Sequence, residues 1–172
     1  EDKLGTQMRA VGEVMSIGKT YKEAFQKAIR SLETGRYGLG HAKNFDSMTK
    51  EQLLSMLGTP SSERHFVMYE ALRKGATVAE IHDLTKVKAY FIDQMRELVE
   101  EEEALLANKG NLPSDDALIS AKKNGFSDKY LSQILEVSEE DIRNKRIALG
   151  VEEAWEGVHV SGTQDSAYYY ST

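Results

Sequence analysis

The chain contains no cysteine among its 172 residues. It therefore has no disulfide framework, no thiolate metal site and no cysteine nucleophile. No apolar run approaches the roughly 20 residues that a membrane-spanning helix requires, and the first residues lack the basic, then apolar order of a signal peptide. We therefore expect a protein of the reducing cytoplasm that is neither secreted by a signal peptide nor inserted in a membrane.

The chain also has fewer positive than negative side chains. It contains 22 lysines and arginines and 28 aspartates and glutamates, which gives a net charge of minus 6. Such a field repels polyphosphate, so unspecific binding to nucleic acids or anionic membranes is disfavoured and protein or small-molecule partners are expected. Apolar residues make up 40% of the chain and charged residues 29%, which predicts a folded core. The length suits one compact domain plus a fragment of another, and excludes two full catalytic domains.

The N-terminal part changes from strand signals to helix signals. Residues 4–18 are rich in valine, methionine and glycine, which predicts one or two strands with a turn and a strand near residues 9–15. Thr20 and Glu23 form a capping-box pattern that predicts a helix at about 21–33. Residues 35–48 contain three glycines without clean periodicity, so the linker is placed at 36–48.

After residue 48 a series of N-cap residues predicts helices along most of the remaining chain. Thr49 precedes a helix at 50–57, Ser61 or Ser62 one that ends near Lys74, and Thr77 one at 78–84. A longer helix is predicted at about 87–106, with four side chains pointing inward: Phe91, Met95, Leu98 and Val99. Three serines cap the last helices, which end near residues 124, 136 and 149: Ser114, Ser127 and Ser138.

Two stretches of this helical region resemble each other at an offset of 50 residues. The first set is Ala71, Gly75, Thr77, Ile81, Leu84, Val87 and Ile92, and the second is Ala121, Gly125, Ser127, Leu131, Ile134, Val137 and Ile142. Each set reads as helix, glycine stop, hydroxyl cap, short helix, turn and longer helix. Because capped amphipathic helices share much of this chemistry, a true repeat and a chance likeness remain equally open.

Candidate catalytic and metal-binding groups are sparse. The four histidines lie far apart without helical ligand spacing, so a metal site is not expected: His41, His65, His82 and His159. His82 and Asp83 are adjacent in a predicted helix and so do not face each other as a base and its orienting carboxylate. The four glutamates at 100–103 are predicted to form a solvated helix end. The glycines near residues 12 and 18 lack the spacing of a phosphate-binding loop.

Residues 127–143 have the pattern of a helix-turn-helix, with Arg143, Lys145 and Arg146 on the second helix. However, the start of that helix, which would enter the DNA groove, carries Glu139, Glu140 and Asp141. Carboxylates there stabilise the helix dipole and repel phosphate. Packing of helices is therefore favoured over DNA recognition.

Residues 8–30, which include Val11-Gly12-Glu13 and Gly18-Lys19-Thr20, resemble the end of the first ATP-grasp domain in the large subunit of carbamoyl-phosphate synthetase. Residues 70–75 and 121–129 resemble that family's helical oligomerisation domain, and residues 168–172 the stretch leading into the second ATP-grasp half. Between residues 151 and 167 the family usually shows a proline and an Asp-Thr-Cys-Ala-Ala-Glu-type run, which this chain lacks. The role of this connector is therefore left open.

The resemblance implies an ATP-dependent ligase that makes carbamoyl phosphate from bicarbonate, glutamine-derived ammonia and ATP, for pyrimidine and arginine synthesis. It places Met8, Val11 and Glu13 on a stretch that lines an internal tunnel; as an alternative, Met8 and Val11 are core residues and Glu13 a salt-bridge or cap partner. The residues that bind ATP and Mg or Mn lie outside this chain in the family. No catalytic residue, cofactor or metal is therefore expected here, and the chain alone is expected to be inactive.

The expected fold is all-α: a multi-helix oligomerisation domain of short capped helices, preceded by a strand-helix remnant of an ATP-grasp α/β domain. The expected domains are the remnant at 1–35, the linker at 36–48, the helical domain at 49–150 and a connector at 151–172. Partners implied by the resemblance are the remaining domains of the large subunit, the glutaminase small subunit and further copies of the chain. A first residue other than methionine and the abrupt end after the tyrosines at 168–170 predict an excised segment. A stand-alone helical adaptor and, less favoured, a DNA-binding regulator are the alternatives.

Overall fold

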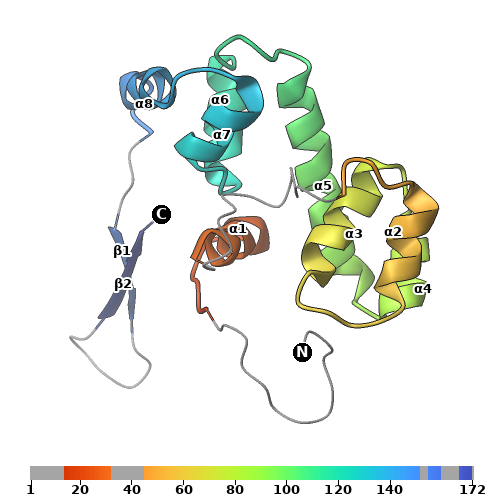
Figure 1. The fold of residues 1–172 in the computed structure, drawn as a ribbon. Helices are drawn as coiled ribbons and strands as arrows, with labels where there is room; N and C mark the ends of the chain where they lie inside the picture. The colour runs from red at the N-terminus through yellow and green to blue at the C-terminus, as the bar shows by residue number, and fades with distance from the viewer. Residues whose placement is uncertain (1–13, 32–44, 152–154, 160–166, 172) are drawn as a thin grey trace.

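The computed structural model describes residues 14–31, 45–151, 155–159 and 167–171, with only the backbone of the last two ranges. These residues form eight helices and one β-hairpin (Figure 1). The helices are α1 (Tyr21–Ser31), α2 (Lys50–Leu57), α3 (Arg64–Arg73), α4 (Val78–Thr85), α5 (Ala89–Leu106), α6 (Asp115–Lys123), α7 (Asp128–Leu135) and α8 (Glu139–Ala148). The prediction of an all-α fold built from short helices is confirmed.

The two strands lie after the helices, in the stretch predicted as a connector. β1 (Trp155–His159) pairs with β2 (Ala167–Ser171) in an antiparallel register that runs from Trp155 opposite Ser171 to His159 opposite Ala167. The strand predicted near residues 9–15 lies mostly outside the described residues. Its described part, Val14 and Met15, belongs to no strand.

Hydroxyl caps begin six of these helices, as the sequence predicts, and at α1 the Thr20 hydroxyl accepts a hydrogen bond from the backbone N–H of Glu23 at 3.2 Å. Thr49 and Thr77 each form a capping box, with Gln52 and Glu80 respectively. Three serine side chains accept a hydrogen bond from the first turn of α6, α7 and α8: Ser114, Ser127 and Ser138. These caps satisfy backbone N–H groups that have no partner inside the helix, and so they fix where each helix begins.

The predicted cap of α3 is wrong. The helix begins at Arg64 after Glu63, which makes no side-chain cap hydrogen bond, and neither Ser61 nor Ser62 occupies the cap position. The backbone N–H of Arg64 instead donates to the carbonyl of Ser61 at 3.3 Å. A turn of the backbone thus takes the place of a hydroxyl cap.

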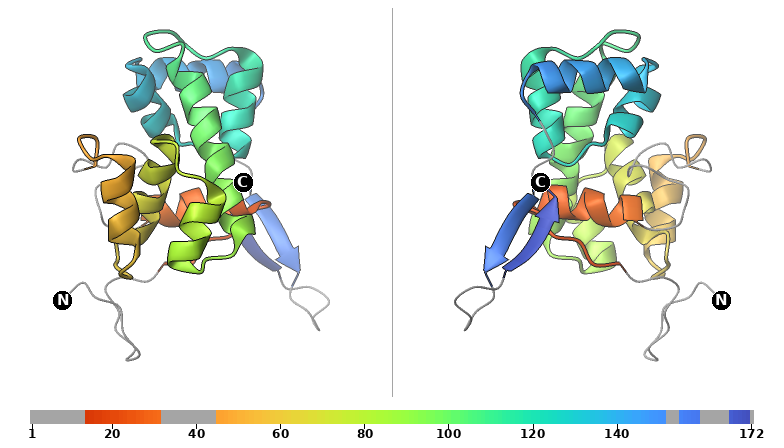
Figure 2. Two further views of the ribbon diagram at one scale, coloured as in Figure 1. Left: turned by 90° about the vertical axis from the view of Figure 1, so that its right-hand side faces the viewer. Right: turned by 90° about the vertical axis from the view of Figure 1, so that its left-hand side faces the viewer.

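Helix α5 is the central element of the fold. It packs against α1, α3 and α4 and, further along, against α7, so it joins two groups of helices (Figure 2). Met95, Leu98 and Val99 are buried, as predicted, whereas Phe91 is only half-buried. One core cluster among the described residues runs from Ile29 of α1 to Ile142 of α8.

The sequence repeat is a structural repeat. In both units the helix ends with the same backbone hydrogen bonds, from Ala76 to Ala71 and from Phe126 to Ala121. The stop glycines, Gly75 and Gly125, have φ angles of 91° and 90°. Equivalent core positions are fully buried in both units: Ile81 and Leu131, then Ile92 and Ile142. Helices α3 to α5 and α6 to α8 are therefore two copies of one unit.

The two units differ in what surrounds them. Leu84 of the first unit is 43% exposed, whereas Ile134, its equivalent in the second, is 2% exposed. The third helix of the unit is also much longer in the first copy, with 18 residues in α5 against 10 in α8. This additional length lets α5 reach the second unit and connect the two.

Candidate functional site

Helix α1 packs into the helical region through aromatic side chains. The ring of Tyr21 lies 5.4 Å from that of Phe25 and 4.8 Å from that of Phe91 on α5. Phe25 in turn meets His65 on α3 edge to face at 5.3 Å. These distances lie in the range of favourable aromatic pairs. The half-buried Phe91 is thus covered on one side by α1.

Helix α1 also meets the second repeat unit at very short range. A Cβ atom added to Gly125 would lie 3.0 Å from the Cα of Glu23 and 3.0 Å from the Cβ of Gln26. Gln26 is buried and donates a side-chain hydrogen bond to the carbonyl of Asn124 at 3.3 Å. Only a glycine permits this approach of the two backbones.

Ionic contacts add to this packing. Lys22 of α1 pairs with Glu97 of α5. The buried Glu23 accepts a hydrogen bond from the backbone of Lys19 at 2.8 Å and pairs with Lys27 at 2.8 Å. We call the contact of Tyr21, Lys22, Phe25 and Gln26 with α3, α5 and Gly125 the α1 seam. The seam holds α1 against both repeat units, beside α5 (Figure 1).

A second notable cluster is charged and buried between α3 and α5. Glu102 is 0% exposed, and the hydroxyl of Tyr69 donates a hydrogen bond to it. Arg73 lies 3.9 Å from Glu102 and 3.1 Å from Glu70, which is 1% exposed. The prediction that residues 100–103 form a solvated helix end is therefore wrong for Glu102. Its position on the α5 face that also carries Met95, Leu98 and Val99 explains the burial.

The Tyr69 hydroxyl makes this cluster sensitive to alkaline pH. Burial raises the pKa of Tyr69 well above its ordinary value of 10.0, and the negative charge of Glu102 raises it further. Above pH 10 an unfolded tyrosine loses its proton while the folded one keeps it, so stability falls as pH rises. We expect Tyr69→Phe to lack this loss, with a slope that differs from the unsubstituted chain by up to about 1.4 kcal/mol per pH unit. Urea denaturation between pH 9 and pH 11 measures both slopes, and equal slopes would contradict the buried ionisable pair.

A third ionic cluster ties the second unit together. Asp128 at the start of α7 lies 2.9 Å from Lys122 of α6 and 3.0 Å from Arg146 of α8. Arg146 also donates to the backbone carbonyl of Val151 at 2.9 Å, where the chain leaves α8. Burial opposes ionisation of Asp128, but Lys122 and Arg146 outweigh it and lower the pKa of that carboxyl. The cluster fixes the three helices and the exit of the chain.

Two of the three basic residues predicted as a DNA-reading face, Lys145 and Arg146, are engaged within the chain. Arg146 is held by Asp128, and Lys145 lies 3.1 Å from Asp115 and donates to the carbonyl of Pro113 at 2.6 Å. The first turn of α8 carries Glu139, Glu140 and Asp141. Because Lys145 and Arg146 pair with carboxylates and α8 starts with acidic residues, little positive charge is left to attract the phosphates of DNA. These contacts favour helix packing over DNA recognition.

The remaining candidate residues do not form a reactive site in the described part of the chain. His82 directs Nδ1 to the backbone carbonyl of Val87 at 2.7 Å, and this contact occupies the nitrogen that a charge-relay partner would need. Among the described residues, no three histidine, aspartate or glutamate side chains come together as a metal site. The predicted tunnel-lining residues, Met8, Val11 and Glu13, lie outside the described residues. None of the helices in the described ranges is long and apolar enough to cross a membrane.

Sequence reasoning missed the α1 seam, because no local pattern shows which helix lies against Gly125. The stop glycines of the two units have the same backbone conformation, but of the two only Gly125 sits against another helix. Sequence spacing shows that a glycine is needed at both positions and says nothing of the neighbour. The burial of Gln26, a polar residue on the apolar face of α1, likewise depends on the partner carbonyl of Asn124.

Residues 13–150 match the family model described as the oligomerisation domain of the carbamoyl-phosphate synthetase large chain. The carbamoyl phosphate synthase large chain of Archaeoglobus fulgidus is 41% identical over 176 residues, covering 98% of this chain and 16% of that protein. That of Rhodopirellula baltica is 39% identical over 178 residues, with the same coverage of 98% and 16%.

The arginine-specific, chloroplastic large chain of Arabidopsis thaliana is 38% identical over 173 residues, covering 98% of this chain and 15% of the plant protein. The chain thus spans about one sixth of the length of these curated relatives. Both the matched family model, which covers helices α1 to α8, and these relatives lead to one assignment. The chain belongs to the carbamoyl-phosphate synthetase large-chain family, in which it corresponds to the oligomerisation domain.

Proposed function

We propose that this chain is the non-catalytic assembly module of a carbamoyl-phosphate synthetase large chain. The observation that carries the proposal is the α1 seam, which holds α1, the first helix of the described residues, against both repeat units at once. At the other end, Arg146 anchors the carbonyl of Val151 as the chain leaves α8. A module fixed at both ends sets the relative position of the segments that it joins.

In this proposal the chemistry belongs to other parts of the protein. The parent enzyme is a ligase that makes carbamoyl phosphate from bicarbonate, glutamine-derived ammonia and ATP, and ATP with Mg or Mn is bound outside this chain. The partners are the ATP-grasp domains, a glutaminase small subunit and further copies of the chain. We place the ATP-grasp remnant at 1–35, the linker at 36–48, the helical module at 49–150 and the connector at 151–172. The tunnel role of Met8, Val11 and Glu13 and the cytoplasmic location stay predictions.

A chimera tests this role directly. The matching segment of the Archaeoglobus fulgidus large chain is replaced by this sequence, and carbamoyl phosphate formation is measured. We expect activity, and we expect His82→Gln and Asp83→Asn to leave kcat and the KM for ATP unchanged within about two-fold, because the proposal places the substrates on other parts of the protein. A fall of kcat by about 100-fold in either variant, at unchanged thermal stability, would assign these residues to the chemistry and contradict the proposal.

The isolated chain provides the complementary measurement. ATP hydrolysis by the 172-residue chain in the presence of Mg, bicarbonate and ammonia is expected to equal that of buffer alone. An inactive point variant of the chimera, changed in its ATP-grasp part, serves as the reference for contaminating activity. Turnover above that reference in the isolated chain would show that it carries a catalytic site of its own.

A further inference from the structure

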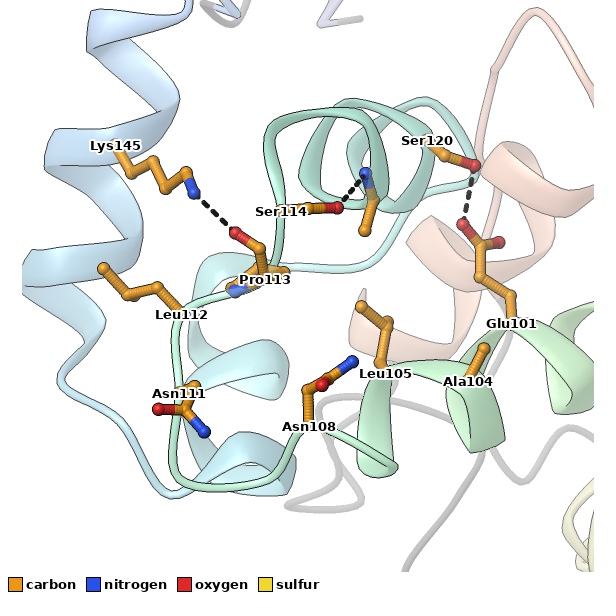
Figure 3. A pocket seen from close by; sticks show the side chains of 11 residues that line it. Glu101, Ala104, Leu105, Asn108, Asn111, Leu112, Pro113, Ser114, Ser120 and Lys145 are labelled. Atoms are coloured by element: carbon orange, nitrogen blue, oxygen red, sulfur yellow. Dashed lines mark hydrogen bonds between the residues drawn. The ribbon is translucent and has the colours of Figure 1, made fainter.

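We infer that a cavity between the end of α5 and α6 binds a small aliphatic ammonium compound. The cavity has a volume of about 540 Å³ and is lined by the last turns of α5, the following loop, α6 and one residue of α8 (Figure 3). Ligand pockets for small molecules commonly fall between about 300 and 1,000 Å³. None of the residues that line this cavity is one of those named in the α1 seam.

Glu101 supplies a negative charge to this cavity and has no counter-ion within the described part of the chain. Its carboxylate lines the cavity and accepts hydrogen bonds from the hydroxyl of Ser120 at 2.8 Å and from the side-chain amide of Asn124 at 2.7 Å. Both donors are neutral, so they orient the carboxylate without neutralising its charge. A preorganised carboxylate of this kind is suited to a charge-assisted hydrogen bond from a cation.

The cationic side chain on the opposite wall is engaged elsewhere. Lys145 lines the cavity from α8, donates to the carbonyl of Pro113 at 2.6 Å and lies 3.1 Å from Asp115. Figure 3 shows Lys145 directed toward Pro113, on the side of the cavity away from Glu101. Lys145 therefore does not serve as the counter-ion of Glu101, and a ligand cation can take that place.

The apolar side chains that line the rest of the cavity favour a cation that carries an alkyl chain. Ala104, Leu105, Leu112 and Ala117 present aliphatic carbon to the cavity, and Leu112 is 40% exposed. Burying a short alkyl chain against these side chains contributes about 0.8 kcal/mol for each methylene group. An inorganic cation gains nothing from this surface, and a neutral alcohol can donate a hydrogen bond to Glu101 but brings no positive charge to it. A primary alkylamine satisfies both parts of the cavity.

Titration of the 172-residue chain with n-hexylamine tests the inference. The amide resonances of Ala104, Asn108 and Ala117 are followed by NMR, with n-hexanol and ammonium chloride as probes that lack the charge or the stem. We expect saturable shifts with hexylamine, and affinity lower by about ten-fold or more for both control probes. Equal response to ammonium chloride would show an unspecific cation effect and overturn the inference.

Two variants identify the groups responsible. Glu101→Gln keeps an acceptor for Ser120 and removes the charge, so hexylamine should bind about ten-fold more weakly. Glu100→Gln is the matched control, because Glu100 pairs with Arg96 and does not line the cavity, and it should leave the affinity unchanged. Leu112→Ser, at a partly exposed position, should weaken hexylamine and spare ammonium. Unchanged affinity in Glu101→Gln, with the fold intact by circular dichroism, would refute the assignment and leave the assembly role untouched.

Discussion

Replacing Gly125 with alanine is expected to destabilise the chain by about 2 to 4 kcal/mol. Two costs combine at this position. The φ angle of 90° is unfavourable for a residue with a side chain, at about 1 to 2 kcal/mol. In addition, the new Cβ would lie 3.0 Å from the Cα of Glu23, a backbone atom that moves only if α1 moves. The substitution therefore forces α1 away from the second repeat unit.

The internal repeat supplies a matched control for this experiment. Gly75 has a φ of 91°, and an added Cβ there meets nothing within 4 Å. Gly75→Ala should therefore carry only the conformational cost. We expect the difference between the two variants, about 1 to 3 kcal/mol, to report the contact with α1. Urea denaturation followed by circular dichroism gives both values, and equal destabilisation would show that α1 is not held at Gly125.

Replacing Glu102 with alanine is expected to reduce the free energy of unfolding by about 3 to 5 kcal/mol. Glu102 is fully buried, and its loss leaves the Tyr69 hydroxyl without its acceptor and the charge of Arg73 less well compensated. An uncompensated buried charge is costly because the surroundings cannot replace the lost interaction with water. The vacated volume adds a cavity next to Tyr69.

The neighbouring Glu103 is the control for Glu102. It belongs to the same helix and also pairs with Arg73, at 3.1 Å, but its side chain is 54% exposed. We expect Glu103→Ala to cost less than about 1 kcal/mol, because water replaces the lost contact. Thermal and urea unfolding of both variants compare the two positions. A similar loss in the two variants would mean that the glutamates share a solvated surface, as the sequence alone predicted.

The helix starts could be predicted from sequence because capping is local. A hydroxyl at Thr49, Thr77, Ser114, Ser127 or Ser138 contacts a backbone N–H only two or three residues away, so spacing alone identifies it. Helix α3 shows the limit of this argument. Its start is set by a backbone turn after Ser61, although hydroxyl side chains stand nearby.

Burial of charge could not be predicted in this way, because it depends on residues distant in the chain. Residues 100–103 are four glutamates with the same composition and different surroundings. Glu102 meets Tyr69 from 33 positions earlier, whereas Glu100 pairs with Arg96 on its own helix. Helical spacing from Met95, Leu98 and Val99 places Glu102 on the buried face of α5, and the position of α3 against α5 supplies its partner. Phe91 is a second example. The sequence predicts that it points into the core, whereas in the structure it is half-buried and its ring contacts Tyr21 of α1.

The internal repeat could be predicted from the sequence only in part. Equivalent stop glycines and core positions are visible in the sequence, and the structure confirms them as copies of one unit. The sequence does not show that the third helix of the first unit extends across the second. In the structure α5 contacts α7, and Leu105 near the end of α5 is buried. The cavity beside Glu101 is lined by the end of α5, the loop that follows it and α6, which are distant from its α8 residue in the sequence.

Hydrogen exchange of helix α1 is the most direct test that this chain acts as one rigid connecting module. An isolated helix of 11 residues is marginally stable in water, so protection of α1 requires the seam. We expect backbone amides from Phe25 to Ser31 to exchange nearly as slowly as those of α5, and Gly125→Ala to speed up α1 selectively. If α1 in the unsubstituted chain exchanges at the rate of an unstructured peptide while α5 stays protected, the helix is not part of the module and the proposed assembly role loses its structural basis.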